Sequence, residues 1–368
     1  MRVGIDRRLI YHFDWLVFFL TLAIAMVGLI SVVSASQSEH HSFHALILRQ
    51  AIWMTAGGVA MFAVVMFDYR ALASYAYPAY LLVVGLLVAV SAIGQATGGS
   101  RRWLNLGLFT LEPSELAKLA LILVLVRYLR EEPPAGGMRL RHLIVPGLLF
   151  AVPAGLVLKE PDLGTMLTLA LIFATIIFVA GLNLRTMAIL MLAMGLAAPL
   201  AWHVLKPYQR QRVVSFLNPQ SDPLGAGYHV IQSEIAVGSG GSWGKGFLKG
   251  TQARLNFLPE QTTDFIFSVY AEEFGFAGAS LLLALYAGLV GRGLWIARHA
   301  RDRFGALLAL GLTAMMFWEA TINIGMATGV LPVVGIPLPL VSYGGSSLIV
   351  LMAAMGLLIS INTRRYLF

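Results

Sequence analysis

The chain has 368 residues, of which 58% are apolar and 12% charged, and its mean hydropathy is +0.78. The apolar residues come in blocks of about 17 to 25, the length that a helix needs to cross the hydrocarbon core of a bilayer. This composition excludes a soluble globular protein, and each block must be helical because no water in the bilayer satisfies free backbone groups. The sequence contains no cysteine, which excludes disulfides, thiolate nucleophiles and thiolate zinc sites.

Ten apolar blocks follow one another along the chain. No small-residue cleavage site with a soluble domain follows the first block, so we interpret it as a retained anchor. We expect an all-α polytopic membrane protein that forms a single domain over residues 1–368, without an internal repeat or linker. The predicted spans are residues 13–34, 46–66, 75–93, 114–130, 142–158, 164–180, 186–205, 265–290, 305–328 and 342–361.

The basic residues of the short loops predict the orientation, since Lys and Arg in short loops favour the cytoplasm. With the N-terminus inside, the inner segments hold fifteen arginines, and the short outer loops hold only Arg49, Arg101, Arg102 and Lys159. Both termini are therefore expected in the cytoplasm. The long polar loop between spans 7 and 8, residues 206–263, is expected outside, where its six basic residues do not count because long loops translocate regardless of charge. The net charge of +8 then reflects orientation and does not indicate a nucleic-acid partner.

The long loop has an internal pattern. Residues 208–216 and 228–237 mix apolar and polar side chains at helical spacing, which predicts two short interfacial helices. Six of the thirteen residues in 238–250 are glycine, which permits tight turns and close approach of the backbone to a ligand. Lys245 does not complete a phosphate-binding Walker motif, because Ser239 stands in place of the first glycine and Gly246 in place of the magnesium-binding Ser or Thr.

Several ionisable residues fall at the outer ends of the predicted spans. Charged groups at such depth are costly and tend to mark function or internal pairing. In chain order they are Arg49, Arg101, Arg102, Glu115, Lys118, Lys159, Glu160, Asp162 and Asp264.

Most of these residues have a structural interpretation beside the functional one. Glu115 and Lys118 are spaced i, i+3, so they can form an ion pair that joins neighbouring helices as well as contact a substrate. Asp162 can cap the helix that follows it. Arg101 and Arg102 can anchor the chain to lipid headgroups.

Asp264 is the strongest candidate for chemistry, because it ends the long loop where the eighth span begins. It could cap that helix, but Thr262 or Thr263 would serve as a cap equally well. We expect Glu319 to pair internally, and Glu272 and Glu273 either to support Asp264 or to bind a neighbouring helix. The residues His40, His41 and His44 fit an exposed polar loop better than a metal site.

Several segments resemble the SEDS family, the shape, elongation, division and sporulation proteins. The signature is Asn323-Ile-Gly-Met-Ala-Thr-Gly-Val-Leu-Pro-Val-Val-Gly-Ile-Pro-Leu-Pro-Leu-Val-Ser-Tyr-Gly-Gly-Ser-Ser347. Trp103-Leu-Asn-Leu-Gly107 with Glu112-Pro-Ser-Glu-Leu-Ala-Lys118, and Glu160-Pro-Asp-Leu-Gly-Thr165, match two further blocks. Residues 246–252 and 255–260 resemble the elongation branch of the family more than the division branch.

The resemblance implies a peptidoglycan glycosyltransferase that polymerises lipid II on the outer face of the bacterial cytoplasmic (inner) membrane. It implies Asp264 as the essential aspartate, Glu115 and Lys118 as a buried charged pair, and Asp162 as the acidic residue before the sixth span. The implied partners are a class B penicillin-binding protein, whose membrane helix packs beside spans 8 and 9, and other proteins of the elongation machinery.

The chemistry of this reaction needs few groups. A sugar hydroxyl is a poor nucleophile at neutral pH, so a carboxylate must take its proton, and Asp264 has the right type and side for a general base. A single essential carboxylate fits transfer with inversion. The leaving pyrophosphate needs positive charge, from basic side chains and from a divalent cation, Mg²⁺ or Mn²⁺, of which Asp264 is a possible ligand. The candidate basic residues are Arg49, Arg101, Arg102, Lys118, Arg210 and Lys245.

Two other functions stay open from sequence. A flippase for the lipid-linked precursor would also need outer charges and lipid grooves, but the charges gather on one face and no inverted repeat is visible. A non-enzymatic scaffold of the cell-wall machinery would make Asp264 dispensable.

Overall fold

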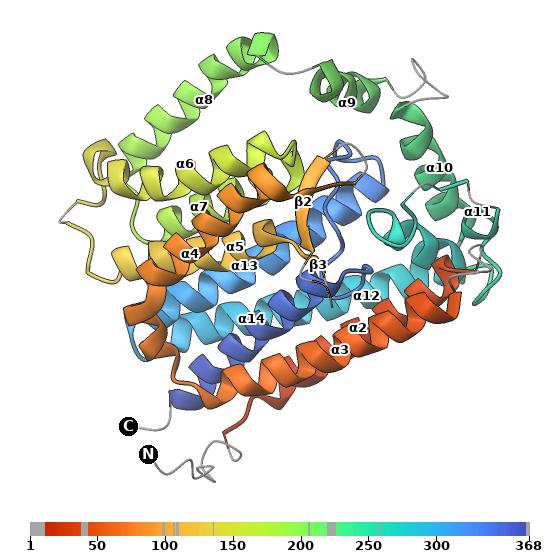
Figure 1. Cartoon of the computed structure of the whole chain (residues 1–368), viewed down its shortest axis with the longest axis horizontal. Helices are drawn as coiled ribbons and strands as arrows, with labels where there is room; N and C mark the ends of the chain where they lie inside the picture. The colour runs from red at the N-terminus through yellow and green to blue at the C-terminus, as the bar shows by residue number, and fades with distance from the viewer. Residues whose placement is uncertain are drawn as a thin grey trace.

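The computed structural model describes residues 12–37, 43–97, 100–105, 107, 110–134, 136–204, 207–218, 226–255, 257–258 and 260–365. In these segments the chain forms a bundle of long helices (Figure 1). The long helices are α2 (Trp15–Ala35), α3 (Phe43–Met66), α4 (Leu72–Ile93), α5 (Pro113–Tyr128), α6 (Ile144–Lys159), α7 (Leu163–Val179), α8 (Leu184–Val204), α12 (Ile266–His299), α13 (Arg303–Ala327) and α14 (Gly345–Arg364).

Each predicted span coincides with one of these helices. Their ends agree with the prediction to within three residues, except that α12 continues to His299, nine residues beyond the predicted end. This extension carries Arg292 and Arg298, so the apolar pattern stops before the helix does. By length and composition, seven helices of the described segments can cross a membrane, whereas α5 and α7 are only 16 and 17 residues long. The number of ten crossings therefore stays a prediction.

One cluster of buried apolar residues extends through the bundle from α2 to α14. Its centre lies where α13 packs against α5 and α7. A Cβ atom at Gly311 of α13 would lie 2.7 Å from a methyl carbon of Ile122 and 3.1 Å from one of Ile176, so glycine allows the three helices to approach closely. Figure 1 shows α2 and α3 along one flank of the bundle and α4, α6 and α7 on the opposite flank, with α8 diverging from them.

The first and last long helices meet at one end of the bundle. The Asp14 carboxylate caps α2 and accepts hydrogen bonds from Asn362 Nδ2 at 2.8 Å and from Arg292 Nε at 3.0 Å. The beginning of α2, the end of α12 and the end of α14 thus lie together, in agreement with both termini on one side. We call this the inner end, following the predicted orientation.

Short elements occupy the opposite, outer end. The strands β1 (Gln95–Thr97), β2 (Ser100–Asn105) and β3 (Thr110–Leu111) form an antiparallel sheet in the order β1-β2-β3, with Ala96 opposite Arg101 and Leu104 opposite Leu111. The two helices predicted in the long loop are confirmed as α9 (Pro207–Leu217) and α10 (Ala226–Ser239), and a short helix α11 (Thr251–Arg254) follows. Their position at the membrane interface stays a prediction. At the inner ends lie two 3-10 helices, η1 (Tyr69–Ala71) and η2 (Leu140–Leu143).

The glycine-rich segment packs into a kink of α12. At Gly275 the backbone leaves the helical region, with φ 63° and ψ −162°. The freed backbone groups pair with the loop instead: Phe276 N donates to Gly241 O at 2.8 Å, and Lys245 N donates to Glu272 O at 3.0 Å. The loop and the kink therefore stabilise one another, since unpaired backbone groups are costly at membrane depth.

Candidate active site at the outer helix ends

The turn that carries Asp264 is held by backbone contacts from both sides. Gln261 Nε2 donates to Ala35 O, at the outer end of α2, at 2.9 Å. Tyr343 N donates to Thr262 O at 2.9 Å, and Ser342 Oγ donates to Thr263 O at 2.6 Å. The turn is thus fixed between α2 and the loop that precedes α14.

The backbone of Asp264 itself is fixed by Asn323, a fully buried residue of α13. Asn323 Nδ2 donates to Asp264 O at 2.9 Å and to Ile336 O at 2.7 Å, which ties the turn to the loop after α13. The Asp264 side chain is partly exposed. Gly335, with φ +75°, lies beside it, and a Cβ atom at Gly335 would lie 3.3 Å from Asp264 Oδ2.

Asp264 does not occupy the N-cap position of α12, which is held by Phe265. The carboxylate nevertheless lies just before the N-terminus of α12, where the helix dipole favours negative charge. Asp264 therefore lies one residue before the N-cap position that the sequence interpretation offered for it.

The long loop covers this turn. Phe265 forms a small buried cluster with Ala236 of α10 and Leu258. The ring of His229, also on α10, stacks on that of Phe265 with 6.3 Å between centroids. Packing of α10 thus connects the loop to the residue that follows Asp264.

Asp162 caps α7, which confirms the structural interpretation given to it from the sequence. Its carboxylate accepts hydrogen bonds from Thr165 N at 3.1 Å and Thr165 Oγ1 at 2.8 Å. Arg102 of β2 lies 3.8 Å from Asp162 Oδ1 and donates to Pro161 O at 2.7 Å. The sheet is thereby joined to the turn between α6 and α7, and Arg102 has protein contacts that a headgroup anchor would not need.

One loop segment, residues 334–336, connects the Asp162 and Asp264 regions. A Cβ atom at Gly164, in the first turn of α7, would lie 2.9 Å from Val334 O and 3.0 Å from Gly335 O. Gly335 in turn lies against Asp264. Residues that are about one hundred positions apart in sequence therefore line two sides of the same short segment.

Two carboxyl groups near Asp162 have pKa values raised above the ordinary range of a glutamate. Burial, together with the negative charges of Asp162 and Glu112, raises the pKa of Glu160 to about 8. Burial and the nearby Glu115 and Asp162 raise the pKa of Glu112 to about 8 as well. Neither carboxyl oxygen of Glu160 has a hydrogen-bond partner within the described segments. The sequence pointed to Glu160 only as one of the charges at the outer span ends, because the burial that raises both pKa values is not visible in the sequence.

Glu115, Lys118 and Glu319 form a buried triad between α5 and α13. Lys118 Nζ lies 2.8 Å from Glu115 Oε1 and also pairs with Glu319 Oε1. The three residues are 3%, 3% and 1% exposed. The predicted ion pair and the internal pairing of Glu319 are confirmed, and contact of Lys118 with a substrate would require α5 and α13 to separate.

Glu272 and Glu273 bind neighbouring segments and do not contact Asp264 through a hydrogen bond in the described residues. Glu272 Oε1 accepts hydrogen bonds from Lys245 Nζ at 2.6 Å and from Thr251 N and Oγ1 at 2.8 Å. Glu273 accepts a hydrogen bond from Ser34 of α2. Lys245 is therefore engaged in holding the glycine-rich segment to α12.

The remaining basic candidates for pyrophosphate binding differ in their exposure to solvent. Arg49 is exposed on α3 and has no ion-pair partner among the residues described. Arg210 lies partly buried on α9. The side chain of Arg101 and residues His40 and His41 lie outside the described part of the molecule.

A resident metal site built from protein side chains is absent from the described segments, which hold no group of three or more His, Cys, Asp or Glu residues suited to a metal ion. A protein-only cage for a divalent cation does not fit this site. A cation that arrives with a substrate pyrophosphate needs only one or two carboxylates, and Asp264 meets that requirement.

The sequence profile of the cell cycle protein family FtsW/RodA/SpoVE matches residues 11–367. This chain belongs to that family. The predicted resemblance to the SEDS proteins is thereby confirmed, and with it a multi-pass protein of the bacterial cytoplasmic membrane.

Two relatives of known name match this chain over nearly its whole length. It is 43% identical to the peptidoglycan glycosyltransferase MrdB of Escherichia coli (strain K12) over 96% of this chain and 94% of the relative. It is 34% identical to the peptidoglycan glycosyltransferase RodA of Treponema pallidum over 97% and 99% of the two chains.

Solved structures of the FtsW/RodA/SpoVE type confirm the fold. One is a chain from a study of how a peptidoglycan synthase complex coordinates polymerization and crosslinking, with TM-score 0.83, 37% identity and coverage of 96% of this chain and 98% of the other. The rod shape determining protein RodA of Thermus thermophilus superposes with TM-score 0.72 at 30% identity, again over 96% and 98% of the two chains.

Proposed function

We propose that this protein is a peptidoglycan glycosyltransferase that polymerises lipid II into glycan strands on the outer face of the cytoplasmic membrane, during cell elongation and the maintenance of rod shape. The names of its relatives MrdB and RodA, matched over nearly the full length, support the reaction. The main structural support for the site is the geometry of the Asp264 turn. Its backbone is held by contacts with α2, α13 and the 334–344 loop, while the Asp264 carboxylate stays partly exposed.

Asp264 acts as the general base in this proposal. The hydroxyl of the acceptor sugar attacks the anomeric carbon of the donor, the new glycosidic bond forms as the bond to the lipid pyrophosphate breaks, and Asp264 takes the hydroxyl proton. The anomeric carbon inverts, because a retaining reaction would need a second carboxylate as nucleophile. The fixed backbone of the turn keeps the carboxylate in position. Holding the reacting groups in the correct geometry supplies much of the rate enhancement in such reactions.

Positive charge assists departure of the pyrophosphate. Arg102 holds the turn before α7, which packs against the loop beside Asp264. Arg49, Arg101 and Arg210 remain candidates, and Lys245 and Lys118 would first have to leave their carboxylate partners. A divalent cation, Mg²⁺ or Mn²⁺, bound with the substrate would neutralise the same oxygens. Ligation of that cation by Asp264 is the alternative to its role as base.

A partner protein completes the machinery. The likeness to a chain of a peptidoglycan synthase complex that coordinates polymerization and crosslinking supports a class B penicillin-binding protein as that partner. Its membrane helix would pack beside α12 and α13, and its transpeptidase would crosslink the strands made here. Other proteins of the elongation machinery would bind the same assembly.

The experiment compares Asp264→Asn with a control from the same turn. Purified protein is incubated with lipid II, the partner and Mg²⁺ or Mn²⁺, and glycan polymer is measured on gels. We expect Asp264→Asn to lower the rate by about 10² to 10⁴-fold, the usual contribution of a general base, with unchanged expression and partner binding.

Glu260→Gln removes an exposed carboxylate four residues away and should polymerise at close to the normal rate. Polymer formation by Asp264→Asn at the wild-type rate would exclude Asp264 as the base. Equal losses in both variants would instead assign the effect to the charge of the turn.

A further inference from the structure

A groove lies between the inner ends of α6 and α8, far from the Asp264 turn. It has a volume of about 530 Å³. Residues of η2 line one wall and residues of the first turns of α8 the other. The lining residues are Arg139, Leu140, Arg141, Asn183, Arg185, Thr186 and Ile189.

The groove is built by two inner loops that pair with one another. Met138 N donates to Gly181 O at 2.8 Å, and Asn183 N donates to Met138 O at 3.1 Å. Asn183 Nδ2 also donates to Gly136 O at 2.5 Å. The loops before η2 and before α8 are therefore held side by side, and their arginines face a common space.

The charge of this groove has one sign. Arg139, Arg141 and Arg185 contribute three guanidinium groups, and no carboxylate of the described residues lines the space. None of the three forms an ion pair with any residue that the structure describes.

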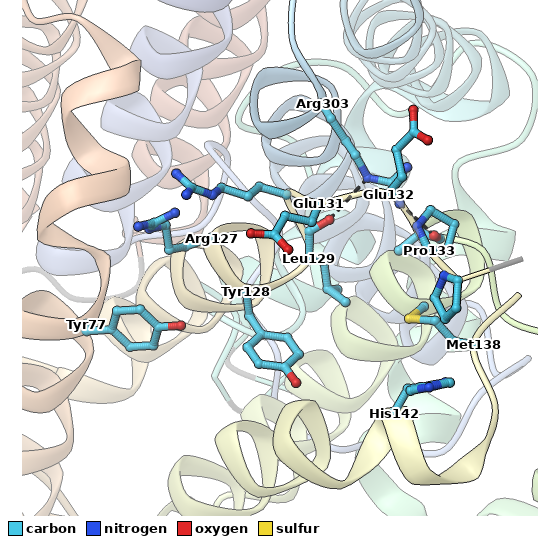
Figure 2. Close-up of a pocket in the computed structure, with 13 residues that line it drawn as sticks. Tyr77, Arg127, Tyr128, Leu129, Glu131, Glu132, Pro133, Met138, His142 and Arg303 are labelled. Carbon is cyan, nitrogen blue, oxygen red and sulfur yellow. Dashed lines mark hydrogen bonds between the residues drawn. The ribbon is translucent and has the colours of Figure 1, made fainter.

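Other inner pockets are of mixed charge. Figure 2 shows the pocket at the inner ends of α5 and α13, where Glu131 and Glu132 lie among the side chains of Arg127 and Arg303. A further pocket combines three arginines with Asp302, whose carboxylate already binds Arg70. Basic residues that only orient a chain in the membrane need not gather around one groove. Although Arg139, Arg141 and Arg185 are exposed, their grouping in the α6–α8 groove calls for a separate explanation.

Exposed apolar side chains continue from the groove along both helices. Ile144 and Leu148 on α6 are 62% and 61% exposed, and Ile189 and Leu192 on α8 are 50% and 65% exposed. Their i, i+4 and i, i+3 spacings put each pair on one face of its helix. A ligand with a phosphate at the groove and apolar chains beside it would match both features, whereas a soluble phosphate would match only the first.

We propose that this groove binds the phosphate of an anionic phospholipid of the inner leaflet, with the acyl chains along α6 and α8. Guanidinium groups suit the site because they donate paired hydrogen bonds to phosphate oxygens. The lipid would fasten the inner end of α8, the helix that diverges from its neighbours in Figure 1. The site is separate from the proposed polymerisation site, and its occupancy is measured without any reaction.

The experiment measures lipid retained by the full chain. Protein is reconstituted in nanodiscs of phosphatidylcholine containing a minor fraction of phosphatidylglycerol, released into mild detergent, and analysed by native mass spectrometry. The wild type should retain phosphatidylglycerol in preference to phosphatidylcholine. Each of Arg139→Gln and Arg185→Gln should lower that retention roughly fivefold, since one basic residue near an anionic headgroup contributes about that factor.

Arg301→Gln is the matched control, because it removes one arginine from the inner surface without touching the groove. It should retain phosphatidylglycerol as the wild type does, and Arg185→Lys should retain an intermediate amount. Circular dichroism and gel filtration establish that all variants are folded. Equal retention by the Arg139→Gln/Arg185→Gln double variant and by Arg301→Gln would overturn the proposal, as would displacement of the lipid by millimolar glycerol 3-phosphate, which would assign the groove to a soluble phosphate.

Discussion

The Asp264 turn and the Lys118 triad both place charged groups at the outer half of the bundle, but their surroundings differ. The turn is fixed through its backbone, and its carboxylate remains partly exposed. In the triad the side chains themselves are the bonded groups, and all three are at most 3% exposed. A group that must exchange a proton with a substrate needs the first arrangement, whereas the second holds helices together.

The largest effect on stability is expected from breaking the triad. Lys118→Met leaves the carboxylates of Glu115 and Glu319 buried without their cation and should destabilise the protein by about 3 to 5 kcal/mol. Thermal unfolding followed by fluorescence-detected gel filtration measures this loss. Lys249→Met, at an exposed lysine of the outer loop, should change stability by less than about 0.5 kcal/mol.

A triple variant then tests whether the Lys118 triad is structural while the Asp264 turn is catalytic. Lys118→Met combined with Glu115→Gln and Glu319→Gln contains no unpaired charge and should recover most of the stability. If this variant is folded and polymerises, the triad is architectural. A folded but inactive triple variant would contradict that view and give Lys118 a direct role with substrate.

A smaller effect is expected where Glu272 holds the glycine-rich segment. Glu272→Gln removes the charge from bonds with Lys245 and Thr251 and should destabilise this contact by about 1.5 to 3 kcal/mol. Hydrogen exchange of residues 245–252 should accelerate while that of α13 is unchanged. Lys245→Ala should have the milder effect, because Glu272 keeps its hydrogen bonds from Thr251 when the lysine is removed. Acceleration throughout the bundle would mean that the segment is not a separate unit.

Over a single pH unit, the smallest effect on stability is expected from the titration of Glu160 at the outer end of α6. Its pKa is raised from 4.5 to about 8 by burial and by Asp162 and Glu112, so the folded protein binds a proton that the unfolded chain has released. Stability should therefore fall as pH rises from about 4.5 to 8, by up to about 1.4 kcal/mol per pH unit.

Glu160→Gln resembles the protonated acid and should flatten that dependence. Thermal midpoints of the wild type and the variant at pH 6, 7 and 8 test the expectation. Glu131→Gln, an exposed acid at the inner end, should leave the slope unchanged. Parallel pH profiles for wild type and Glu160→Gln would show that Glu160 is ionised throughout.

The hydrophobic blocks of the sequence predicted most of the helices, because a segment in a bilayer has to form its backbone hydrogen bonds within itself. The short strands β1 to β3 were not predicted, since their residues lack an apolar alternation and their pairing depends on neighbouring segments. The end of α12 was also missed, because it carries arginines beyond the apolar pattern. Position and spacing, by contrast, singled out Asp264, Asp162 and the Glu115–Lys118 pair, and the family resemblance implied their roles, without any knowledge of their distances.

Composition and the pattern of charge by themselves determined that this chain is a helical membrane protein with a long polar loop, and its motifs determined its family. These properties are local, because hydropathy, residue spacing and short motifs act within one segment. Only the tertiary structure decided that Lys118 takes Glu319 from another helix, that Lys245 is engaged by Glu272, and that Gly335 lies against Asp264. Those contacts join residues far apart in sequence, and the burial that defines them exists only after the helices have packed.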